Sequence, residues 1–65
     1  MELYNEILKY LEIHGNPSSH EFKNGTKVVG IPLKKFLLEW YNQAVLEYKE
    51  YGTLNNVAAL KKLIN

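Results

Sequence analysis

Residues 32–52, PLKKFLLEWYNQAVLEYKEYG, decide the fold of this chain. Proline suits the first position of a helix and glycine suits the position just past its end, so Pro32 and Gly52 predict the limits of one long helix. Between these limits, apolar side chains recur at helical spacing and indicate an apolar face. That face is formed by Leu33, Leu37, Trp40, Ala44, Tyr48 and Tyr51. The longest helix is therefore predicted at about residues 32–51, with an apolar face wide enough to contact two neighbours.

A second helix is predicted at the start of the chain, at about residues 2–14. Its apolar stripe has helical spacing and consists of Leu3, Ile7, Tyr10, Leu11 and His14. Gly15 suits a left-handed C-terminal residue, and Pro17 shortly after it cannot continue a helix.

A third helix is predicted at about residues 55–64, after the long one. Val57, Leu60 and Ile64 form its apolar stripe. Thr53 and Asn55 are the candidates for its N-cap, because their side-chain oxygens can accept hydrogen bonds from the first free N–H groups.

The fold class predicted from these signals is all-α, a compact three-helix domain with a long central helix. At 65 residues, the chain is too short for two packed cores, so residues 1–65 form a single domain. The central helix is expected to bury Leu37, Trp40, Ala44 and Tyr48 against Leu8, Leu11 and Leu60.

Residues 16–31 allow two interpretations. Ser18 and Glu21 have the spacing of a capping box, which favours a short turn of helix. Asn24-Gly25 is instead a strong signal for a two-residue hairpin turn, with short strands on either side. The sequence slightly favours a loop with extended character at about residues 26–31, and the alternatives of short helix and hairpin stay open.

Composition excludes several classes of function. Cysteine is absent, which excludes disulfides, thiolate nucleophiles and cysteine metal sites. The net charge is +1, which indicates neither a protein that coats nucleic acid nor an acidic mimic of DNA. No apolar run approaches the ~20 residues of a membrane span, so no membrane contact is expected and a cytoplasmic location is predicted.

The sequence predicts no enzyme, cofactor or metal site. Ser18, His20 and Glu21 supply the residue types of a nucleophilic triad, but side chains this close in sequence point in different directions. His14 and His20 are the two histidines, and their separation matches no zinc spacing. His14 is more simply a favourable group at the negative end of a helix dipole.

Paired lysines support a first hypothesis of function, phosphate binding. Lysines in the first turn of a helix oppose its dipole, and a helix N-terminus with added lysines suits a phosphate. A small nucleic-acid-binding accessory protein is therefore predicted, with Asn42 on a base edge. The lysines expected on phosphate are Lys27, Lys34, Lys35, Lys61 and Lys62.

The second, almost equal hypothesis is a protein-binding module, such as a phage- or mobile-element-type inhibitor or adaptor that contacts a host protein. Leu38 and Leu46 fall towards the polar side of the central helix, where an exposed apolar patch would mark an interaction surface. Together with Tyr41 and Lys49, these leucines form the candidate interface, and a homodimer is also compatible with it.

A series of short motifs resembles the helicase-associated domain, a small all-helical module. The motifs are His14-Gly15-Asn16-Pro17, Asn24-Gly25, Val29-Gly30, Asn42-Gln43, Gly52-Thr53-Leu54 and Leu60-Lys61-Lys62-Leu63. Two positions depart from the family pattern: its tryptophan two residues after the glycine is Pro32 here, and its arginine after the glutamine is Ala44. The resemblance implies an all-helical fold and binding of nucleic acid.

Overall fold

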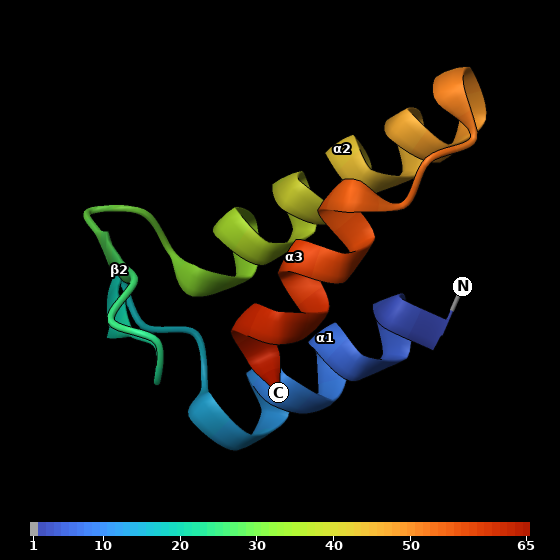
Figure 1. Cartoon of the computed structure of the whole chain (residues 1–65). Coiled ribbons are helices and arrows are strands. Elements are labelled where there is room, and N and C mark those ends of the chain that lie inside the picture. The colour runs from blue at the N-terminus through green and yellow to red at the C-terminus, as the bar shows by residue number, and fades with distance from the viewer. Residues whose placement is uncertain (1) are drawn as a thin grey trace.

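The computed structural model describes residues 2–65 and contains three helices and one small sheet. The helices are α1 (Glu2–His14), α2 (Leu33–Tyr51) and α3 (Asn55–Ile64), and the strands are β1 (Ser19–Glu21) and β2 (Lys27–Val29) (Figure 1). The three predicted helices are confirmed, and the domain is mostly helical. Among residues 2–65, no helix combines the length and apolar character that crossing a bilayer requires.

The segment between α1 and α2 forms a hairpin, so the short helix that the capping-box spacing favoured is wrong. The strands are antiparallel, and His20 lies opposite Val28. Gly25 has a φ of +90° and donates its N–H to the Phe22 carbonyl at 3.0 Å, which closes the turn. The Asn24 side chain accepts the N–H of Thr26 at 3.0 Å. Asn24-Gly25 therefore marks the turn, since glycine adopts a positive φ without strain. The last strand pair is Glu21 with Lys27, so the connection is longer than the two residues predicted.

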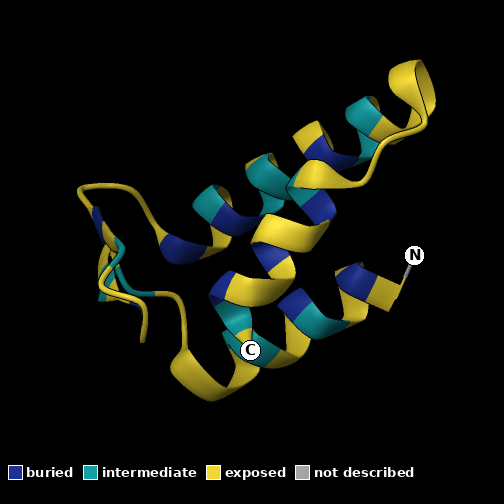
Figure 2. Cartoon of the chain, viewed as in Figure 1, coloured by how far each residue is buried: buried dark blue, intermediate teal, exposed yellow. Residues whose placement is uncertain are grey.

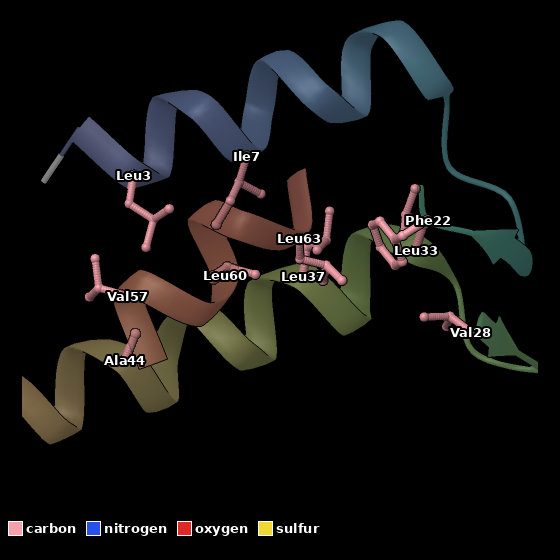
Figure 3. Packing of buried hydrophobic residues seen from close by; sticks show 10 residues of the cluster. All are labelled: Leu3, Ile7, Phe22, Val28, Leu33, Leu37, Ala44, Val57, Leu60 and Leu63. Carbon is pink, nitrogen blue, oxygen red and sulfur yellow. The ribbon is translucent and has the colours of Figure 1, made fainter. Parts of the chain in front are cut away.

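A single apolar core joins the helices and the hairpin. α3 packs against both α1 and α2, and the core side chains converge between them (Figure 3). The hairpin adds two side chains to this core, Val28 from β2 and Phe22, which directly follows β1. Alternate residues of a strand face the same side, so the neighbours of Val28 in β2 point away from the core. The buried apolar residues are Leu3, Ile7, Phe22, Val28, Leu33, Leu37, Ala44, Val57, Leu60 and Leu63.

The predicted core is correct in part. Leu37, Ala44 and Leu60 are fully buried, as expected. Tyr48 is 53% exposed and Leu8 is 40% exposed, so these two predictions are wrong. Leu8 lies five residues after the buried Leu3, about 140° around a helix, and so falls at the edge of the apolar stripe.

Tyr48 is exposed because α2 is longer than the elements that cover it. α2 has 19 residues and α3 has 10, so the last turns of α2 extend beyond the body of the domain (Figures 1 and 2). Two other predicted core residues, Trp40 and Leu11, are partly buried and pack against the core.

The loop after α1 fixes the start of α2. The backbone N–H of Leu33 donates to the carbonyl of Pro17 at 2.7 Å, and the N–H of Lys34 donates to Oδ1 of Asn16 at 2.6 Å. These bonds satisfy two of the N–H groups that a helix N-terminus leaves free. The residues that end α1 therefore also cap the start of α2.

Candidate protein-binding surface

Four large side chains within nine residues are exposed where α2 ends and the chain turns into α3. We call them the apolar end of the molecule. Their exposed fractions are 47% for Leu46, 53% for Tyr48, 76% for Tyr51 and 50% for Leu54. The hairpin lies at the opposite end of the molecule (Figure 1). The longest dimension of the molecule is 32 Å.

A glycine ends α2 and sets the position of these side chains. Gly52 has a φ of +71° and donates its N–H to the carbonyl of Tyr48 at 2.9 Å, the pattern of a left-handed C-terminal cap. The chain reverses there, and Leu54 precedes the first residue of α3. The turn therefore places Leu54 beside the last residues of α2.

An open groove of about 430 Å³ lies on one side of the apolar end. Leu3 and Val57, which belong to the core, line it together with the exposed side chains of Tyr48 and Leu54. Its remaining lining residues are Glu2 and Lys61, which bring one charge of each sign. An apolar centre with a charged rim is the usual anatomy of a protein interface.

A second open groove, of about 330 Å³, lies between α2 and the start of α3. Leu46 and Tyr51 line it with Glu47 and Glu50. The exposed apolar side chains of α2 therefore contribute to two grooves at the same end of the molecule.

Glu47 joins the two helices that form this second groove. One carboxylate oxygen accepts the N–H of Asn56 at 2.8 Å, and the other accepts the hydroxyl of Thr53 at 2.6 Å and the N–H of Asn55 at 3.3 Å. The hydrogen bond from Thr53 and those from the backbone hold the pKa of Glu47 below its ordinary value. The predicted caps, Thr53 and Asn55, are wrong: Leu54 is the N-cap residue, and a carboxylate from another helix satisfies the N–H groups.

The predicted protein-interface residues divide into two pairs. Leu46 and Lys49 are exposed on the C-terminal half of α2. Leu38 and Tyr41 are partly buried and pack against the core, and the Tyr41 ring lies 5.4 Å from that of Tyr4. Leu46 and Lys49 are therefore more accessible to a partner than Leu38 and Tyr41.

The predicted phosphate-binding lysines are distributed over β2, α2 and α3. Lys34 and Lys35 are exposed in the first turn of α2, and Lys27 is exposed at the start of β2. Since two N–H groups at this helix end are already bonded within the chain, phosphate contacts there would depend on the lysine side chains. Lys27 also lies 3.9 Å from the carboxylate of Glu21.

The other predicted nucleic-acid contacts are separate from these. Lys61 lines the groove that contains Tyr48, and Lys62 is exposed in the last turn of α3. Asn42 lines a third open groove, of about 660 Å³, with Glu39 and Trp40. No lysine lines this third groove, so Asn42 does not share it with the predicted phosphate contacts.

Sequence patterns did not identify Tyr48 and Leu54 as surface residues. Tyr48 falls in the centre of the apolar stripe of α2, and periodicity alone assigns such a residue to the core. The available signal was the difference in length between the second and third predicted helices, which leaves the end of the longer one uncovered.

The hairpin places the two histidines next to each other, which their spacing in sequence did not predict. The ring centres of His14 and His20 are 5.2 Å apart, and the planes are inclined by 62°. The hydroxyl of Tyr10 lies 2.8 Å from Nε2 of His20, and the Tyr10 ring lies 4.1 Å from that of His14.

Comparison of the chain with protein-family models, with curated proteins and with solved structures gives no match. The resemblance to helicase-associated domains rests on the short motifs alone and stays a prediction.

Proposed function

We infer that this chain is a non-catalytic protein-binding module whose contact surface is the apolar end. The single observation that carries this inference is the exposure of Leu46, Tyr48, Tyr51 and Leu54 at one end of a 65-residue domain. Soluble monomers commonly expose apolar side chains singly, whereas four large ones within nine residues of a small domain are a candidate interaction site.

The residue types at this end suit a partner protein. Tyrosine is enriched among the residues that dominate binding energy, because a rigid ring buries a large area and its hydroxyl retains a hydrogen bond. The groove beside Tyr48 has Leu3 and Val57 in its lining, so an apolar side chain of the partner would contact the core directly. The expected partner surface is therefore a helix or loop with a bulky apolar residue at its centre.

The charged residues of this groove suit a partner surface that carries charges of both signs. Glu2 and Lys61 line the same groove as Tyr48, so a partner that carries both a cation and an anion around its apolar centre is complementary. The phage- or mobile-element-type inhibitor or adaptor predicted from the sequence is one form of such a protein-binding module.

Site-directed photo-crosslinking tests the proposed surface. A photoreactive residue at Leu54 should crosslink one protein in cells that express the chain, and the same residue at Val29 should not. Val29 is a matched control because it is 72% exposed and belongs to β2, in the hairpin at the opposite end.

The crosslinked protein is then purified and its affinity for the chain measured. Leu46→Glu should weaken binding by more than tenfold, because a charge in an apolar interface loses its hydration. Replacing Lys34 and Lys35 with glutamate should change mainly the association rate. Equal affinity of Leu46→Glu and the unchanged chain would contradict the proposed surface.

Nucleic-acid binding is the second candidate function, and the exposure of Lys27, Lys34 and Lys35 supports it. Three phosphate contacts would give a log–log dependence of affinity on salt with a slope of roughly −3. The test is a titration of a random duplex at several salt concentrations, with the Lys34→Glu, Lys35→Glu double variant as the comparison. Absence of binding at about 50 mM salt would exclude this candidate.

A further inference from the structure

We propose that His14 and His20 form a two-histidine binding site for a zinc or copper ion at the junction of α1 and the hairpin. The site lies at the opposite end of the molecule from the apolar end, and it does not depend on the proposed protein-binding function. Two imidazole nitrogens, one from α1 and one from β1, would bind the ion, and only the folded chain brings these two segments together.

The separation of the rings fits a shared metal ion. Two imidazoles on one tetrahedral zinc, each with a zinc–nitrogen distance of about 2.0–2.1 Å, have ring centres about 5 Å apart. The ring centres of His14 and His20 are 5.2 Å apart, with an angle of 62° between the planes. The separation of the two ring centres is therefore compatible with one ion bound to both histidines.

Tyr10 supplies the hydrogen bond that metal-binding histidines usually have. The non-ligating nitrogen of such a histidine commonly donates to an oxygen, which fixes the orientation of the ring and its protonated nitrogen. The Tyr10 hydroxyl lies 2.8 Å from Nε2 of His20. When the phenol oxygen accepts the Nε2–H, Nδ1 of His20 carries the lone pair for the metal.

Tyr10 also contacts the other proposed ligand. Its ring packs against the ring of His14, with centres 4.1 Å apart. Tyr10 is therefore a positioning residue for the pair.

The surroundings leave space for an ion and its water. Tyr10, His14 and His20 line a partly enclosed cavity of about 200 Å³, and Glu21 and Lys23 also line it. Residues 2–65 contain no group of three or more histidine, cysteine or acidic side chains placed to hold a metal. Water would therefore fill the remaining positions, and the affinity would be modest. Lys23 and Glu21 bring one charge of each sign to the lining, and the Glu21 carboxylate also lies 3.9 Å from the ammonium of Lys27.

Metal binding should connect the hairpin to α1. His14 is the last residue of α1, and His20 is the central residue of β1. Because the unfolded chain does not hold the two rings at this separation, an ion that binds both favours the folded state. The free energy of binding would then appear as resistance to unfolding.

The experiment is calorimetric titration of the full chain with zinc chloride and with copper sulfate, followed by thermal unfolding. One ion should bind per chain, copper more tightly than zinc, in accordance with the usual order of affinities. Zinc at ~100 times its Kd should raise Tm by about 10 °C or more. Magnesium, which prefers oxygen ligands, should have no effect.

Three variants identify the ligands. His14→Gln and His20→Gln should each abolish the rise in Tm, and circular dichroism shows whether each variant is folded. Tyr10→Phe should retain one ion per chain with an affinity about tenfold lower, because both ligands remain and only their orientation is lost.

Three results would overturn the proposal. The first is a chain that does not bind zinc or copper. The second is a folded single-histidine variant that retains the affinity of the unchanged chain. The third is a fall in Tm with zinc, because that would show preferential binding to the unfolded chain.

Discussion

At the scale of single residues, Glu47 shows how one carboxylate can stabilise a junction between helices. It lies on α2, yet it accepts the N–H groups of Asn55 and Asn56 at the start of α3. A negative charge near a helix N-terminus also interacts favourably with the helix dipole. The side chain therefore acts as the cap that the residues before α3 do not provide.

Glu47→Gln should lower the stability of the domain, and the loss should depend on pH. The pKa of Glu47 is depressed in the folded state, so its contribution is present above the unfolded-state pKa and is lost as pH falls through the folded-state pKa. Urea unfolding should show a clear loss at about pH 7 that shrinks towards pH 3. Glu50→Gln, which removes the same charge from the exposed face of α2, should show no such loss.

At the scale of elements, the two ends of α2 are fixed by different means. Its start is bonded to Asn16 and Pro17, which lie far away in sequence. Its end is a local event at Gly52, where a positive φ reverses the chain. A left-handed residue other than glycine strains the backbone by about 1–2 kcal/mol.

Gly52→Ala should therefore destabilise the domain by about 1 kcal/mol. Apart from its chain neighbours, no atom lies within 4 Å of the position that a Cβ would occupy at Gly52, so backbone strain is the expected cause. Gly52→Asn should cost less, because asparagine tolerates the left-handed region. Chemical denaturation of both variants checks this order, and an equal loss for the two would contradict it.

The same elements show what the sequence could predict. Periodicity and the Pro32 and Gly52 limits predicted the three helices because those signals are local. The choice between hairpin and short helix stayed open because Ser18 and Asn24 carry competing local signals. The Glu47 cap and the meeting of the histidines could not be predicted, since both depend on how distant segments pack.

At the scale of the whole molecule, the core is small and shared by every element. A chain of this length has a free energy of unfolding of roughly 3–10 kcal/mol. Leu60 is fully buried on α3, the helix that packs against both of the others. Much of the stability therefore depends on a few side chains at this junction.

Leu60→Ala should destabilise the domain by about 2–5 kcal/mol, through lost burial and the cavity left behind. Ile13→Ala is the matched control, because Ile13 is 72% exposed on α1, and it should change stability by about 0.5 kcal/mol or less. Urea unfolding measures both. A loss for Leu60→Ala no larger than that for Ile13→Ala would show that α3 is not docked as described.

The single tryptophan gives the chain an optical reporter of this docking. The indole N–H of Trp40 on α2 donates to Oδ1 of Asn56 on α3 at 3.1 Å, and the ring contacts Phe36 edge-on with centres 5.7 Å apart. Separation of α3 from α2 would expose the indole to water and shift its fluorescence emission to longer wavelength. Because no other tryptophan contributes, time-resolved emission can follow the opening and closing of this one helix pair in the unlabelled protein.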